Sequence, residues 1–181
     1  ECEAAAQRVA VLDLPGFTKF AVTGTGAPAW LDHMVAGVVP KPGRTALNYF
    51  LNDRGGIVTE MTLTNLGGGR YWLISAAAGE KHDEHWLREH VPADGSVHID
   101  NVSARYGSLI VVGPKSRELL SQLTRADLSN EAFPWLSVRA IAESTSAVAC
   151  SKRFSNSRVS TKSEFQIIER SETAISDRPA H

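Results

Sequence analysis

The chain has 181 residues, of which 43% are hydrophobic and 22% are charged, and its formal net charge is −1. These values are typical of a globular protein of one domain, or one domain with an appendage, that has enough apolar residues for a core. Because Lys and Arg are spread along the chain and no run of 18 apolar residues is present, the composition argues against a nucleic-acid partner and against a membrane span.

The N-terminal region and the cysteines bear on compartment. Residues 1–10 lack the basic and apolar regions of a signal peptide, and the missing initial Met suggests a fragment or a processed chain. Cys2 and Cys150 stand far apart and outside any metal-ligand spacing, which is typical of a reducing compartment. We therefore expect a cytoplasmic protein, or one of the mitochondrial matrix if the source is eukaryotic.

A strand, a glycine turn and a helix are expected in succession after the Ala-rich N-terminal stretch. Residues 17–23 alternate as a strand, Gly24 ends it, and residues 27–35 have helical periodicity. Three large apolar residues then share one helical face: Trp30, Leu31 and Met34.

The densest strand and turn signals follow in residues 41–78. Three strands separated by Gly-rich turns are expected there: residues 45–51, 57–66 and 71–75. In the middle strand the period of two places Glu60 on one face with Val58, Thr62 and Thr64. Glu60 is thus predicted to be a lone carboxylate flanked by hydroxyl groups.

Residues 79–90 are expected to form a helix with Trp86, Leu87 and His90 along one stripe, and residues 97–102 the next strand. His82, His85 and His90 invite a metal-dependent hydrolase interpretation, but no third ligand is specified by their spacing. A solvated charged face is therefore the favoured interpretation of this helix.

The first unit then recurs, with an apolar strand at residues 108–112, a turn at Gly113 and a helix at residues 115–123. Superimposing Gly24 on Gly113 aligns three apolar pairs: Trp30 with Leu119, Leu31 with Leu120 and Met34 with Leu123. This weak internal repeat predicts an α+β fold of duplicated strand-turn-helix units, whose helices cover one face of a mainly antiparallel sheet.

The C-terminal residues 141–181 differ in composition from the rest of the chain. They contain nine Ser and no Gly, Leu, Trp or Tyr, so they lack the residues of a core. We expect one domain over residues 1–140, followed by a tail that is either a flexible extension or not native to the domain.

Several segments in residues 3–140 match one known family in collinear order. They are VLDL at 11–14, KF at 19–20, GR at 43–44, LNDRGGI at 51–57, TLTNL at 62–66, VGP at 112–114 with Arg117, and LSNEAF at 128–133. Together they resemble the aminomethyltransferase (glycine-cleavage T-protein) family, most closely the branch that forms the C-terminal half of dimethylglycine and sarcosine dehydrogenases.

The resemblance implies that the domain binds tetrahydrofolate in a cavity and passes it a one-carbon unit from a methylated amine or aminomethyl donor. It makes Glu60 the acidic residue at the reacting nitrogens, where the family has an Asp one methylene shorter. Four further positions would line the pocket: Leu47, Thr62, Thr64 and Ser75. FAD is implied only if an oxidoreductase domain precedes this segment.

Other interpretations remain open beside this one. The family continues into a Gly-Glu segment that holds the pterin and into a C-terminal barrel, and neither follows residue 140 here. The scaffold would then serve as a non-catalytic folate-binding or interaction module, with Glu60 facing solvent. An incomplete domain with open sheet edges is also expected to pair with itself as a homodimer.

Overall fold

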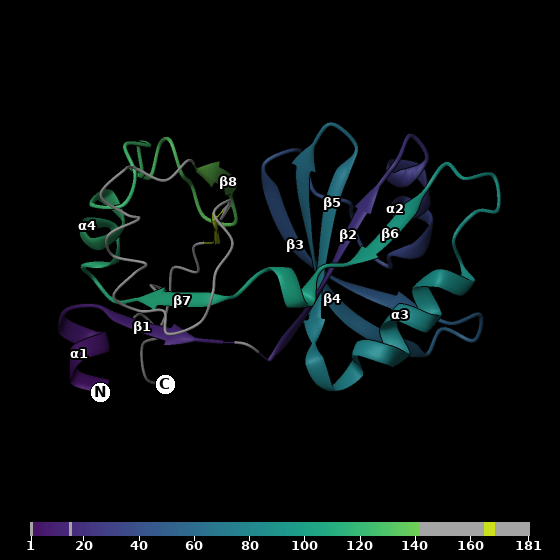
Figure 1. The fold of residues 1–181 in the computed structure, drawn as a ribbon, viewed down its shortest axis with the longest axis horizontal. Coiled ribbons are helices and arrows are strands. Elements are labelled where there is room, and N and C mark those ends of the chain that lie inside the picture. Colours follow the sequence, from purple (N-terminus) through teal and green to yellow (C-terminus); the bar gives the residue numbers. More distant parts are fainter. Residues whose placement is uncertain (1, 15, 142–164, 169–181) are drawn as a thin grey trace, which may run out of the picture.

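A five-stranded sheet organises the lobe on the right of Figure 1. The structure is a computed structural model, and it describes residues 2–14, 16–141 and 165–168. The strands lie in the order β3-β4-β5-β2-β6, and all neighbouring pairs are antiparallel. Their bounds are β2 (Phe17–Thr23), β3 (Arg44–Leu51), β4 (Ile57–Gly67), β5 (Arg70–Ala76) and β6 (His98–Asn101). The mainly antiparallel α+β fold and the three central strands predicted from the sequence are confirmed.

The turn between β3 and β4 is made by its own residues. Asn52 Oδ1 accepts hydrogen bonds from the backbone N–H groups of Arg54 at 3.0 Å and Gly56 at 2.9 Å. Gly55 adopts a φ of 76°, which favours glycine because it has no Cβ. The NDRGG segment therefore fixes this hairpin locally.

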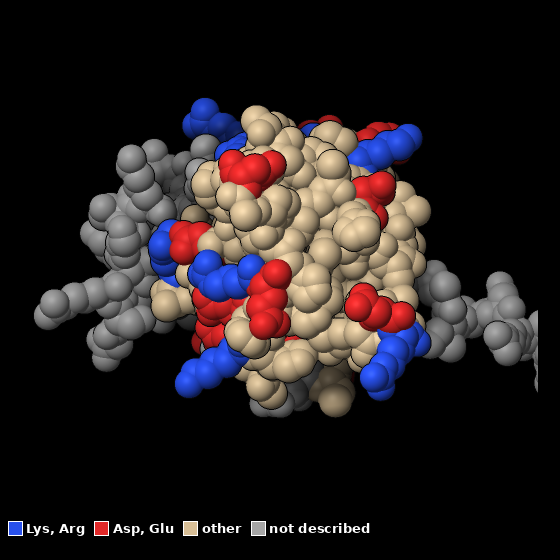
Figure 2. All heavy atoms as spheres, turned by 90° about the vertical axis from the view of Figure 1, so that its right-hand side faces the viewer, with Lys and Arg blue, Asp and Glu red and all other residues tan. Residues whose placement is uncertain are grey.

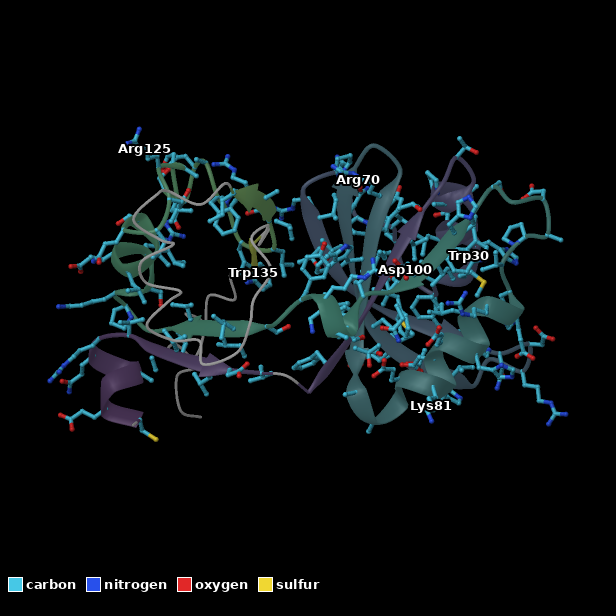
Figure 3. The ribbon with its side chains drawn as sticks, in the orientation of Figure 1. Trp30, Arg70, Lys81, Asp100, Arg125 and Trp135 are labelled. Atoms are coloured by element: carbon cyan, nitrogen blue, oxygen red, sulfur yellow. The ribbon has the colours of Figure 1, made fainter. Side chains whose placement is uncertain are left out.

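Two helices cover one face of the sheet, α2 (Ala27–Met34) and α3 (Glu80–Glu89) (Figure 1). A Pro in its first turn suits the start of α2, and its predicted apolar face is buried as expected. Trp30, labelled in Figure 3, donates its indole N–H to the His90 carbonyl oxygen at 2.7 Å and so ties α2 to the end of α3. The core beneath the helices contains fully buried side chains from β2, β3, β4 and β5, including Phe20, Phe50, Leu63 and Leu73.

Trp86 and His90 lie along one side of α3 as predicted, with ring centroids 4.3 Å apart, but the burial of this helix differs along its length. His90 is exposed, whereas Asp83 and Leu87 are buried against the sheet and Trp86 is partly buried. Residues four apart share a helix face, so Asp83 lies on the same side as Leu87. The outer side carries the Arg88–Glu84 ion pair at 2.8 Å.

The second lobe, at left in Figure 1, contains the first and the last of the described elements. It includes α1 (Cys2–Gln7), β1 (Ala10–Asp13), β7 (Leu109–Val112), α4 (Ser116–Ser121), β8 (Val138–Ile141) and β9 (Phe165–Ile168). Antiparallel pairing joins β1 to β7 and β8 to β9. The 3₁₀ turns η1 (Ala77–Gly79) and η2 (Ser103–Arg105) precede α3 and β7.

Backbone hydrogen bonds join this lobe to the start of β3. The N–H of Thr45 donates to the Leu136 carbonyl oxygen at 3.0 Å, and the N–H of Val138 donates to that of Gly43 at 2.8 Å. Most of the tail predicted over residues 141–181 lies outside the described residues, so the boundary at residue 140 stays a prediction.

The predicted repeat has the same turn geometry in both copies. Gly24 and Gly113 adopt φ angles of 123° and 121°. Two residues later, the N–H of Gly26 donates to the Ser96 carbonyl oxygen at 3.0 Å, and the N–H of Lys115 donates to that of Arg8 at 2.8 Å. The two helices do not share a sheet, however, because the second copy pairs only with β1, in the other lobe.

The surface of the larger lobe mixes both signs of charge. Figure 2 views the right-hand end of Figure 1 and shows acidic and basic side chains interspersed around a largely uncharged centre. None of the helices in the described part of the chain is long and apolar enough to cross a membrane.

Candidate functional site

A concavity opens where β4 and β5 separate. Pairing between these strands runs from Gly67–Arg70 to Thr62–Ile74, whereas β4 begins five residues earlier, at Ile57. Residues 57–61 therefore pair with β3 on one side only. The space between the strand ends has a volume of about 420 Å³, within the range of about 300–1,000 Å³ typical of small-molecule sites.

One wall of this concavity comes from the β3–β4 hairpin. Cross-strand pairing sets Leu47 opposite Thr62 and Tyr49 opposite Glu60, so all four side chains share the sheet face that lies away from the helices. Leu47 is 57% exposed and Glu60 is also exposed, so this wall is open to solvent.

Glu60 acts on its cross-strand neighbour. A hydrogen bond to the Glu60 carboxylate, assisted by the negative charge of that group, raises the pKa of the Tyr49 hydroxyl above its usual value. The protonated phenol is favoured because it donates to the carboxylate, whereas a phenolate beside Glu60 would be repelled. The wall thus presents an anionic oxygen next to a hydroxyl donor.

The opposite wall comes from the end of β5 and the first turn of α3. Ser75 Oγ donates to Asp83 Oδ2 at 2.7 Å, and His82 Nδ1 lies 3.1 Å from Asp83 Oδ1. Asp83 is only 3% exposed, while the His82 side chain is 62% exposed. Gly79, at the helix start, completes this wall beside Asp83.

The structure brings four of the five predicted site residues to the concavity: Leu47, Glu60, Thr62 and Ser75. Thr64 is not among its lining residues. It lies further along β4, where pairing with β5 is intact, and its buried hydroxyl is 3.1 Å from that of Thr45. Ser75 lines the concavity from the helix-covered face of β5, and its hydroxyl group donates a hydrogen bond to Asp83.

The charged residues of α3, which were expected to be solvated, differ in burial: Asp83 is buried, whereas His82 and His85 are exposed. Asp83 is buried because Ser75 and His82 satisfy its carboxylate oxygens. His85 instead pairs with Glu89, and the Nδ1–H of His90 donates to the Trp86 carbonyl oxygen at 2.7 Å. Among the described residues, no group of three or more His, Cys, Asp or Glu is placed to hold a metal ion.

His82 and Asp83 are the ionisable lining residues that the sequence analysis did not place at the site. A carboxylate four residues before the buried Leu87 was the available signal, because both positions share the inner face of the helix. The partner of Asp83 on β5 depends on how the helix docks, which the periodicity does not encode.

The family model described as the GCVT N-terminal domain matches residues 1–155. The chain belongs to this family. It is 38% identical over 134 residues to the mitochondrial dimethylglycine dehydrogenase of Mus musculus, covering 74% of this chain and 15% of that protein. It is 32% identical over 134 residues to the aminomethyltransferase of Deinococcus deserti, covering 72% of this chain and 37% of that protein.

A solved structure shares the fold. The crystal structure of the glycine cleavage system aminomethyltransferase T from Bartonella henselae matches with a TM-score of 0.63 and 22% identity, covering 75% of this chain and 37% of that one. The resemblance inferred from the sequence motifs is therefore confirmed at the level of the family and the fold. The chain spans well under half the length of each of these three proteins.

Proposed function

We propose that this chain is the tetrahydrofolate-binding part of a one-carbon transferase that uses a methylated amine or an aminomethyl donor. Membership of the GCVT N-terminal domain family supports this function. The observation that carries it further is the gathering of Leu47, Glu60, Thr62 and Ser75 around one concavity.

The residues present fit part of a folate molecule. The apolar side chains of Leu47, Val58 and Ile74 offer a surface for a flat ring, and the Glu60 carboxylate offers an acceptor for its N–H groups. Because the hairpin wall is exposed, these residues account for one side of a binding site. We assign Leu47 and Thr62 to contact with the ring. Thr64 has no assigned contact with the ligand, because its hydroxyl is buried against that of Thr45.

Tetrahydrofolate would supply the nitrogen that receives the one-carbon unit. The contribution of this chain is the negative charge of Glu60, which stabilises positive charge on a nearby amine nitrogen. Such stabilisation grows as water is excluded, because the effective dielectric constant falls. A carboxylate as exposed as Glu60 is therefore expected to act strongly only when a ligand covers it.

The relatives named above are longer proteins, so oxidation of an amine, a flavin and the choice of donor are proposals for a longer polypeptide that contains this domain. The name of the mouse relative places that protein in mitochondria. A mitochondrial matrix location for this chain in a eukaryote, and a homodimer in solution, remain predictions.

The test is a calorimetric titration of the chain with tetrahydrofolate under anaerobic conditions, which measures binding. Formaldehyde-dependent formation of methylenetetrahydrofolate is then measured above the protein-free rate. In Glu60→Gln, which keeps size and removes charge, we expect that rate to fall about 100-fold, the lower end of the loss seen when one buried electrostatic stabiliser is removed, because Glu60 is exposed. Glu118→Gln, at an exposed glutamate on α4 in the other lobe, is the matched control and should retain the wild-type rate.

The second candidate is a non-catalytic folate-binding module, favoured by the solvent exposure of Glu60. Binding of tetrahydrofolate without turnover, and with equal affinity in Glu60→Gln, would support this module over the transferase. Absence of binding at millimolar tetrahydrofolate would contradict both.

A further inference from the structure

We propose that His82 is a second proton-transfer residue of this concavity, held in place by Asp83 and Ser75, and that it takes a proton from an ammonium-bearing substrate. This inference rests on the proposed function, because it concerns the same concavity and the same class of amine donor. It assigns a role to the wall opposite Glu60, where the sequence analysis favoured a solvated charged helix face.

The hydrogen bonds of Asp83 fix the orientation of the imidazole. One carboxylate oxygen accepts the Ser75 hydroxyl at 2.7 Å, and the other lies 3.1 Å from His82 Nδ1. An ionised carboxylate only accepts hydrogen bonds, so Nδ1 carries the proton in the neutral imidazole. The lone pair is therefore on Nε2, the nitrogen that can accept a proton.

The position of Asp83 suits a fixed carboxylate. It lies in the first turn of α3, where the helix dipole favours negative charge, and it is 3% exposed. Its bond to Ser75 links the helix to the end of β5, so the carboxylate is anchored from two elements. A buried carboxylate of this kind orients a histidine in the way that outer-shell carboxylates orient functional imidazoles elsewhere.

His82 is accessible to a small molecule, because it lines the concavity with a side chain that is 62% exposed. Its neighbour Lys81 is also exposed and lies at the lower edge of the larger lobe in Figure 3. His85, one turn further along α3, is 76% exposed but is not among the lining residues, and its Nε2 lies 3.3 Å from Glu89 Oε1. The same helix therefore supplies a matched histidine with a different partner and a different tautomer.

The proposed proton transfer involves only the substrate nitrogen, His82 and water. An N–H bond of the substrate ammonium breaks, a proton binds Nε2 of His82, and the electron pair stays on the substrate nitrogen. A neutral amine nitrogen with its lone pair can form a bond to carbon, whereas an ammonium cannot. The imidazolium that results is paired with the Asp83 carboxylate, and its exposed ring returns the proton to water.

The first test follows the ring nitrogens of the histidines by nitrogen-15 NMR in the whole chain. We expect His82 in the Nδ1–H tautomer and His85 in the Nε2–H tautomer. N,N-dimethylglycine, used as the amine probe, should shift the His82 signals and leave those of His85 unchanged. An Nε2–H tautomer at His82, or equal responses at the two histidines, would overturn the proposal.

The second test compares His82→Gln with His85→Gln in the formaldehyde-dependent assay. There the amine is tetrahydrofolate, whose nitrogen becomes an ammonium as it bonds to formaldehyde and must lose a proton before methylenetetrahydrofolate forms. We expect kcat to fall about 100-fold in His82→Gln, the lower end of the contribution of a proton-transfer group, with KM for tetrahydrofolate unchanged. His85→Gln should match the wild type. Equal activities of the two variants in a working wild-type background would overturn the role of His82 and leave the proposed function standing.

The positioning role of Asp83 and Ser75 has its own readout. Asp83→Asn and Ser75→Ala should raise the Nε2–H population of His82, a change that a merely structural contact would not produce. Should Asp83→Asn fail to fold, Ser75→Ala carries the same measurement. Should the wild type show no transfer at all, the proposed function fails, and a selective response of His82 to N,N-dimethylglycine still decides whether this wall binds an amine.

Discussion

The two copies of the strand-glycine-helix unit share a turn and differ in what surrounds them. Gly24 and Gly113 have φ angles within a few degrees of each other, and the following N–H groups find equivalent carbonyl oxygens. Yet β2 has neighbours on both edges, and the three apolar residues of its helix are buried. In the other copy β7 pairs only with β1, and Leu119, Leu120 and Leu123 are partly buried. The turn is thus a local property, whereas burial depends on the sheet that the unit joins.

The largest test of this difference truncates an equivalent leucine in each helix. Leu31 is fully buried, so Leu31→Ala should lower the free energy of unfolding by about 2–5 kcal/mol. Leu120 is partly buried, and Leu120→Ala should cost about 1 kcal/mol, as for an average substitution. Urea unfolding followed by circular dichroism measures both. Equal losses would mean that the second lobe is as well packed as the first.

A smaller effect is expected from the two turn glycines. Gly24→Ala and Gly113→Ala each force a side chain into positive φ, at about 1–3 kcal/mol of strain, and each new Cβ would overlap a carbonyl oxygen, that of Ser96 or Arg8. Hydrogen exchange should show β2 and β6 opening in Gly24→Ala, and only β1 and β7 opening in Gly113→Ala. Loss of protection across both lobes in Gly113→Ala would show that the lobes unfold together.

The smallest effect concerns two aspartates in matching turns, one in each lobe. Ser96 N donates to Asp94 Oδ1 at 2.9 Å, and Ser129 N donates to Asp127 Oδ1 at 2.8 Å. These serines lower both carboxyl pKa values, that of Asp94 chiefly through the Ser96 side chain and that of Asp127 chiefly through the Ser129 backbone. The resulting stability is present above the unfolded pKa of about 3.9 and is lost as pH falls through the lowered folded values.

We therefore expect the urea midpoint to decline below about pH 4, and the decline to become shallower by a similar small amount in Asp94→Asn and Asp127→Asn. Asn keeps the oxygen acceptor and removes the titration. A change in only one of the two variants would show that these turns, unlike the glycine turns, differ between the lobes.

The features that were predicted correctly from the sequence are those encoded by neighbouring residues. Asn52 and Gly55 define the β3–β4 turn, and the periodicity of residues 27–35 identifies the buried face of α2. The sequence also led to the family through short collinear motifs, and Glu60 was placed on its strand by simple alternation.

The features that the sequence did not reveal depend on long-range docking. The separation of β4 from β5 arises from a register that only the assembled sheet defines, and it leaves Thr64 away from the concavity. Asp83 carries a charge and was therefore assigned to the solvated face of its helix, but the hydroxyl of Ser75 makes its burial favourable. Such pairing between a strand end and a helix start has no signature in either segment alone.

The one-sided pairing of residues 57–61 also has a mechanical consequence. The hairpin arm that carries Glu60 is hydrogen-bonded to β3 alone, while the wall that carries His82 is braced by the sheet and a helix. The distance between Glu60 and His82 thus changes when the β3–β4 hairpin bends, because the wall that carries His82 is held more rigidly. A molecule that bridged them would have to stiffen that arm, and part of its affinity would be spent on lost hairpin motion.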